Sequence, residues 1–142
     1  EKIMFDVQII GRIKHAEKVQ WMCEHILYSL MPRTTQRVDV TVSFVKECDN
    51  QCAGDSYGDH EEVFISIARQ SHGYKYSFNE QILTLCHELV HAKQFIKKEL
   101  SGTGGVWKGV DMSLIRGIEN MPWEQEAFEL ETKLYDKYIS MF

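Results

Sequence analysis

The sequence predicts an α+β fold, in which strands and helices share one hydrophobic core. Three segments alternate apolar and polar residues, which is the period of a half-buried β-strand. Three longer segments repeat apolar residues every three or four positions, which is the spacing of an amphipathic helix. Because 142 residues are enough to bury one core, we expect residues 1–142 to form a single domain.

The predicted strands cover residues 3–10, 37–46 and 62–69. Val38, Val40 and Val42 illustrate the alternation, and such β-branched residues favour strands. The first two strands flank a helical segment, and this order can place them parallel through a right-handed crossover. We therefore expect a short mixed sheet of three strands or slightly more. The polar stretch 47–61 contains glycine and aspartate and is expected to be a loop.

The predicted helices cover residues 15–31, 77–101 and 121 to near the C-terminus. Ser77 and Glu80 have the spacing of a capping box at the start of the second helix, and Gly102 is expected to stop it. Pro122 marks the start of the third helix, because proline suits a first helical turn. Residues 101–119 contain five glycines and are expected to form a loop or an irregular hairpin.

One pentapeptide, HELVH at residues 87–91, points to a specific chemistry. On a helix, His87 and His91 lie on the same face one turn apart, so their imidazoles converge on one point. Zinc accepts two such nitrogens, and Glu88 can then reach a water on the metal. A shuffled chain of this composition would contain HExxH in roughly 2 per cent of cases. Chance is therefore a poor explanation of the motif.

A third protein ligand is needed for a catalytic zinc site, because such sites leave the fourth position to water. The helix around HELVH is apolar, so a buried His-Glu-His set requires polar partners. The later segment PWEQEA offers two carboxylates, Glu124 and Glu126, on the first turn of the third helix. Either can supply the ligand.

The segments HELVHAKQF, VWKG and PWEQEA resemble those of the gluzincin branch of zinc metallopeptidases. The resemblance is to its minimal single-domain forms and to small phage-encoded HExxH proteins, and it covers residues 77–131. It implies a small zincin-like domain in which the HExxH helix is followed by a glutamate helix. It also implies Glu124, with Ala127 in an ExxA-like turn, as the third zinc ligand and Glu126 as the alternative.

One departure from the family pattern concerns the support of a histidine ligand. Many gluzincins carry an aspartate four residues after the ligand glutamate, and here that position is Phe128. Glu131 lies almost one turn further along and can take this role, since such partners fix the tautomer of a ligand. The other interpretation of Glu131 is a solvated helix residue.

The resemblance implies a zinc-dependent peptidase that acts on a peptide or protein substrate. Zinc (Zn²⁺) on His87, His91 and Glu124 would activate water, and Glu88 would act as the general base. The candidate donors for the oxyanion are Tyr57, His72, Tyr74 and Tyr76. The expected substrate-binding edge of the sheet is the strand at 62–69.

Two other functions fit the same residues. The first is a zinc-stabilised binding or regulatory module without proteolysis, such as a phage accessory protein. The presence of Glu88 favours catalysis over this module, whereas the short chain favours the module because it offers no second lobe for a cleft. The second is a zinc-free α+β interaction domain, which requires HELVH to be accidental.

The composition argues against several partners. The net charge is -5 and the basic residues are scattered, so neither a nucleic acid nor an anionic membrane is an expected partner. No apolar run approaches the length of a membrane span, and the first ten residues lack the features of a signal peptide. We expect a soluble, cytoplasmic protein, with a virus-encoded source allowed by the resemblance. The oligomeric state is left open.

Four cysteines are present, and only Cys48 and Cys52 are spaced as a pair. A disulfide or half of a zinc site would fit this spacing, with His60 as the nearest further ligand. We predict a reduced pair in a loop, because cytosolic proteins keep their thiols reduced. Cys23 and Cys86 lie on apolar helix faces and are expected to be buried.

Overall fold

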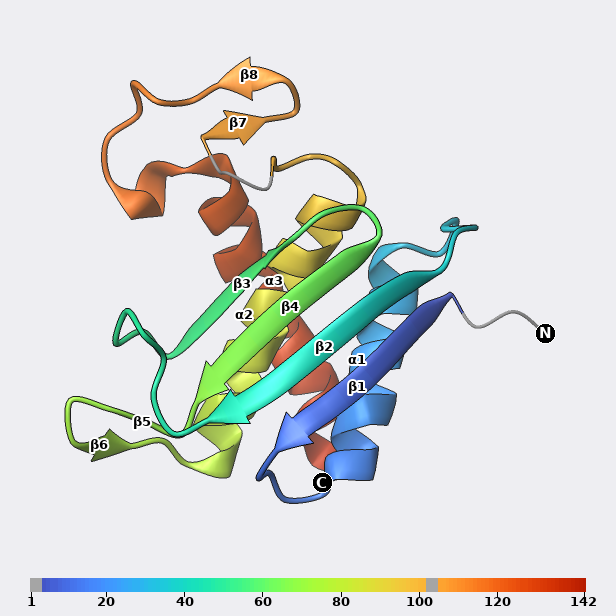
Figure 1. The fold of residues 1–142 in the computed structure, drawn as a ribbon, viewed down its shortest axis with the longest axis vertical. Coiled ribbons are helices and arrows are strands. Elements are labelled where there is room, and N and C mark those ends of the chain that lie inside the picture. Colours follow the sequence, from blue (N-terminus) through green and yellow to red (C-terminus); the bar gives the residue numbers. More distant parts are fainter. Residues whose placement is uncertain (1–3, 102–104) are drawn as a thin grey trace.

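Four strands form one mixed sheet in the order β1-β2-β4-β3 in the computed structural model, which describes residues 4–101 and 105–142 (Figure 1). The strands are β1 (Phe5–Gly11), β2 (Val38–Val45), β3 (Gly54–Gly58) and β4 (Glu62–Ala68). β1 pairs in parallel with β2 across the helix α1 (Ala16–Leu30), as the strand-helix-strand order predicts. β2 also pairs in parallel with β4. The predicted α+β class is therefore confirmed.

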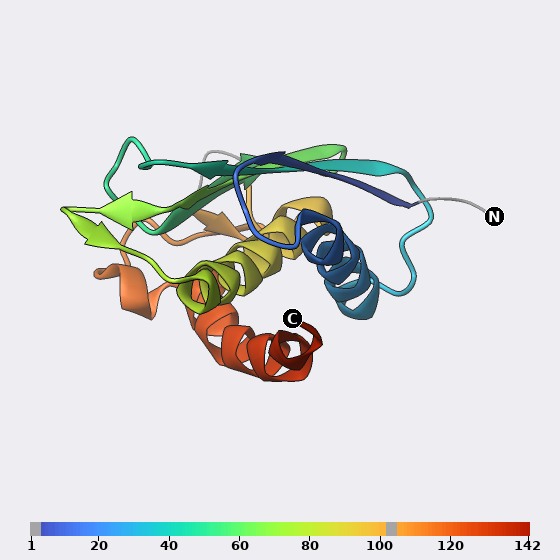
Figure 2. The same cartoon turned by 90° about the horizontal axis from the view of Figure 1, so that it is seen from below.

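All three long helices lie on one side of this sheet, and Figure 2 shows the sheet and the helices as separate layers. The second helix, α2 (Phe78–Ile96), and the third, α3 (Pro122–Tyr138), follow the sheet in the chain. α1 and α2 pack on the sheet, while α3 packs on α2. The alternate residues Val38, Val40 and Val42 of β2 are almost fully buried in this core. α2 is thus enclosed between the sheet and α3, which explains its wide apolar face.

The predicted loop at 47–61 is wrong in its second half, because β3 forms there and pairs antiparallel with β4. The polar and glycine-rich segment GDSYG carries little apolar alternation that would mark a strand. β3 is the edge of the sheet and β4 is an interior strand. The strand at 62–69 is therefore not the free edge that we predicted.

The helix α2 begins where the sequence predicts but ends earlier. Ser77 and Glu80 form the predicted capping box, with both reciprocal hydrogen bonds present. The helix ends at Ile96, before the predicted stop at Gly102, which lies outside the described residues. Lys98 adopts a left-handed conformation with φ of 60°, and the amide of Glu99 bonds to the carbonyl of Gln94. A lysine thus occupies the position where such helix ends usually carry glycine.

The remaining elements are short. They are β5 (Gln70–Ser71), β6 (Tyr74–Lys75), β7 (Val106–Trp107), β8 (Val110–Asp111), and the 3₁₀ turns η1 (Ile118–Asn120) and η2 (Ile139–Met141). β7 and β8 form a small antiparallel hairpin, as the alternative of an irregular hairpin at 101–119 predicts. Pro122 is in the first turn of α3, as expected. No helix among the described residues is long and apolar enough to cross a membrane.

Candidate metal centre

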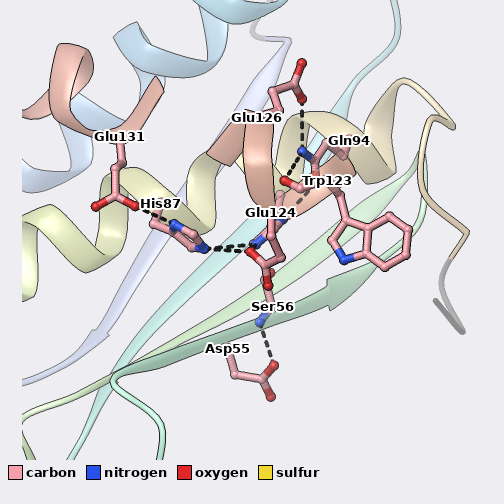
Figure 3. Close-up of polar contacts among 9 residues, drawn as sticks. Asp55, Ser56, His87, Gln94, Trp123, Glu124, Glu126 and Glu131 are labelled. Atoms are coloured by element: carbon pink, nitrogen blue, oxygen red, sulfur yellow. Dashed lines mark hydrogen bonds and ion pairs between the residues drawn. The ribbon is translucent and has the colours of Figure 1, made fainter. Parts of the chain in front are cut away.

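Two helices bring three potential metal ligands together. α2 carries His87 and His91 one turn apart. The first turn of α3 carries Glu124, which points toward His87 (Figure 3). Oε1 of Glu124 lies 3.0 Å from Nε2 of His87 and 2.9 Å from Nε2 of His91. The two Nε2 atoms are 3.1 Å apart. This cluster could hold a metal ion.

The spacing of these atoms fits a small cation. Three atoms about 3 Å apart leave a point about 2 Å from each, which matches the zinc–nitrogen and zinc–oxygen distances of about 2.0–2.2 Å. Two imidazole nitrogens and a carboxylate are also a ligand set that zinc accepts in catalytic sites. Both the spacing and the donor types of the cluster therefore fit zinc.

The outer nitrogens of both histidines face hydrogen-bond acceptors. Nδ1 of His87 lies 2.7 Å from Oε1 of Glu131, and Nδ1 of His91 lies 2.7 Å from Oε1 of Gln94. The orientation of Gln94 follows from its other end, where Nε2 donates to the carbonyl of Trp123. Each neutral imidazole therefore carries its proton on Nδ1 and presents a lone pair at Nε2.

A cation or a proton is required between the inner atoms of the cluster. Two lone pairs and a carboxylate oxygen about 3 Å apart repel one another unless positive charge lies among them. Burial lowers the pKa of His87, but hydrogen bonds to Glu124 and Glu131 outweigh it and raise that pKa to about 9. Burial raises the pKa of Glu124, but the two histidines outweigh it and lower that pKa to about 2. In the metal-free protein, a proton thus takes the place of the cation.

Glu88 lies beside the cluster without belonging to it. Its side chain is buried, with 6% exposed, and burial raises its pKa although His91, Ser56 and His87 act in the opposite direction. Gly54 of β3 permits this packing, because a Cβ there would lie 2.6 Å from Cγ2 of Thr84 and 3.2 Å from Cγ of Glu88. The missing side chain of Gly54 thus allows β3 to approach the carboxylate.

A cavity of about 320 Å³ opens onto Glu88 and the three potential ligands. β3 and the loop before it line one side, with residues that include Asn50, Cys52 and Ser56. Phe95, Leu100 and Trp123 line an apolar part of the cavity. The cluster is therefore reachable from outside.

The structure also places the other predicted site residues. Glu126 turns away from the cluster, and its carboxylate accepts hydrogen bonds from Lys93 and Gln94. Glu131 contacts His87, as one of its two interpretations predicts, and the ring of Phe128 lies 4.9 Å from that of His87. Tyr57, His72, Tyr74 and Tyr76 do not line the cavity of the cluster. Tyr74 instead donates to Glu80 at the start of α2.

No cysteine among the described residues belongs to the metal cluster. All four are free, and Cys23, Cys48 and Cys86 are buried. Across residues 4–101 and 105–142, no cluster of potential metal ligands includes Cys48, Cys52 or His60. Cys52 is exposed and lines the cavity.

Sequence reasoning missed three residues of this site: Ser56, Gly54 and Gln94. Gln94 follows His91 by three positions and so lies on the same helix face, which is a signal that the sequence contains. Gly54 and Ser56 depend on the unexpected strand β3, so the sequence alone carries no comparable signal for them.

No family model, curated protein or solved structure matches this chain. The gluzincin resemblance therefore stays a prediction from the three motifs.

Proposed function

We propose that this chain is a zinc-dependent metallopeptidase with a zincin-like fold. One observation carries the proposal: a buried carboxylate, Glu88, shares an open cavity with the three-donor cluster. A purely structural zinc site has four protein ligands and needs no additional carboxylate. The three donors would be His87, His91 and Glu124.

The reaction requires a base that also returns its proton. Zinc, when bound, lowers the pKa of water towards about 7 and polarises a carbonyl oxygen. Glu88 would take a proton from the attacking water and give it to the leaving amine nitrogen as the carbon–nitrogen bond breaks. Its raised pKa suits both transfers, because a carboxyl group with a pKa nearer neutrality can accept and release a proton more evenly.

The substrate would bind along the edge strand β3. An edge strand presents backbone groups that a further extended chain can pair with, and β3 also lines the cavity. Ser56 of this strand lines the same cavity as Glu88. The proposed substrate strand would therefore place its carbonyl groups next to the base.

Metal analysis and a cleavage assay test this proposal together. The purified wild type should contain about one zinc per chain, and His87→Ala should contain far less. The wild type should also cleave members of a broad peptide library. A protein that binds one zinc and cleaves none of the library would favour the zinc-stabilised binding module instead. A protein that binds no zinc would contradict both functions.

A further inference from the structure

A chain of buried polar contacts continues outward from the proposed ligand His91. Gln94 is fully buried, and its Oε1 accepts from Nδ1 of His91. Its Nε2 lies 2.9 Å from both the Trp123 carbonyl oxygen and Oε1 of Glu126. Figure 3 draws both contacts as dashed lines. One amide therefore contacts α2 at His91 and the first turn of α3 at two points.

Lys93 forms the last contact of this polar network, beyond Gln94 and Glu126. Its Nζ lies 2.9 Å from Oε2 of Glu126 and 2.7 Å from Oε1 of Glu99. Lys93 is 8% exposed, and a lysine this buried requires carboxylate partners. The ion pair keeps the Glu126 carboxylate where it accepts a hydrogen bond from the Gln94 amide.

The direction of the Gln94 amide decides how His91 can act. With its NH₂ group toward Glu126, Gln94 turns its oxygen toward His91 and keeps the imidazole proton on Nδ1. If the amide were reversed, an NH₂ group would face Nδ1 and the proton would have to move to Nε2. Nε2 would then carry no lone pair for a metal.

The same amide also sets the position of the third ligand. Glu124 directly follows Trp123, whose carbonyl accepts from Gln94, and precedes Glu126 by two residues. This turn of α3 is therefore fixed to α2 at the level of His91. The contact acts on two of the three proposed ligands.

We infer that Gln94, Glu126 and Lys93 form a positioning clamp, which selects the metal-binding tautomer of His91 and places Glu124 beside it. The inference rests on the proposed metal site and not on peptidase activity. Gln94 acts directly on His91, whereas Glu126 and Lys93 are positioning residues that act through Gln94. The predicted roles can therefore be separated by combining substitutions.

Zinc affinity, measured by competition with a coloured chelator, tests the clamp through a double-mutant cycle. Gln94→Met should weaken zinc binding by about 10–100-fold, the range for partners of ligating histidines. Lys93→Met should cause a smaller loss, and Lys93→Arg should restore much of it. Lys93→Met should add no loss in the Gln94→Met background, because it acts through that residue. The exposed control Glu129→Gln should leave zinc affinity unchanged.

An equal loss from Lys93→Met in both backgrounds would overturn the inference, since lysine would then act independently of Gln94.

A second measurement uses only the wild type, so it tests the inference even if a variant does not fold. Nitrogen-15 NMR of the zinc-loaded wild type should find the His91 proton on Nδ1 and slow to exchange with water. A proton on Nε2 would overturn the inference. If the wild type binds zinc but cleaves nothing, only the peptidase proposal fails.

Discussion

Oε1 of Glu131 lies 2.7 Å from Nδ1 of His87, although the two residues are 44 positions apart. The contact connects α3 to α2 at the proposed ligand His87, about two helical turns after Glu124. In the proposed metal site, Glu131 would orient the ligand His87, from a position other than the one occupied by Phe128.

Removal of this support should weaken metal binding. We expect Glu131→Ala to lower zinc affinity by about 10–100-fold, because His87 loses the acceptor that holds its proton on Nδ1. Glu131→Gln keeps an acceptor oxygen and should recover part of the loss. Chelator competition measures both effects. Equal zinc affinity in Glu131→Ala and the wild type would show that the contact does not support the metal site.

The two candidate ligand glutamates should behave differently. Glu124→Ala should remove zinc, because two histidines alone do not hold a catalytic ion. Glu126→Ala should retain stoichiometric zinc with reduced affinity, since its carboxylate faces Lys93 and Gln94. Zinc content after dialysis checks this difference. If Glu126→Ala lost zinc and Glu124→Ala kept it, the third ligand would be Glu126 and not Glu124.

The stability of the metal-free protein should fall as pH rises above neutrality. The pKa of His87 is raised from 6.5 to about 9, so the folded state holds this proton more tightly than the unfolded state. This stabilisation is complete below pH 6.5 and is lost as pH rises through about 9, on the order of 1–3 kcal/mol. Urea unfolding with a chelator at pH 6, 7.5 and 9 measures the decline.

Zinc should reverse this trend, because metal binding needs neutral imidazoles and so strengthens as protons leave. The stabilisation that zinc adds should therefore grow between pH 6 and pH 9. A His87→Gln variant is the control and should show a flatter pH dependence without metal. The same pH slope with and without zinc would contradict the proposed competition between proton and metal.

Gly54 should be required for the placement of Glu88. In Gly54→Ala the new Cβ would meet Cγ2 of Thr84 and the Glu88 side chain, and such overpacking costs about 1–3 kcal/mol. We expect lower unfolding stability and lower peptidase activity with zinc retained. Thermal unfolding, zinc content and cleavage rate check the three effects.

A compensating substitution gives the control for this prediction. Thr84→Ser removes the nearest methyl group but keeps the hydroxyl that donates to the carbonyl of Glu80. Combined with Gly54→Ala, it should restore part of the stability and activity. If Gly54→Ala alone matched the wild type in both properties, Gly54 would have no part in placing Glu88.

Strong local patterns explain which parts of the fold the sequence predicted. The alternation at Val38, Val40 and Val42 marks β2, and the Ser77 capping box marks the start of α2. β3 escaped prediction because its pairing with β4, rather than its own apolar pattern, makes it a strand. The end of α2 was placed too late because the stop depends on the backbone of Lys98 instead of a glycine.

The candidate site also contains residues that local sequence patterns predict and residues that depend on tertiary packing. Helical spacing predicts that His87 and His91 lie together, whereas the Glu124 turn is predicted only from the gluzincin resemblance. The partners behind them depend on how α2 and α3 pack, which local spacing does not determine. Glu126 and Glu131 illustrate the difference. The sequence offers both for roles at the proposed metal site, and only packing separates the residue that contacts His87 from the one that pairs with Lys93.

The most direct test of the central claim is the cleavage of an unfolded protein substrate by wild type and Glu88→Gln at matched zinc content. We predict that the wild type cleaves it and that Glu88→Gln, with the same zinc per chain, is about 10²–10⁴-fold slower. Equal cleavage by both proteins would contradict the role of Glu88. A zinc-loaded wild type that cleaves no substrate would contradict the peptidase itself.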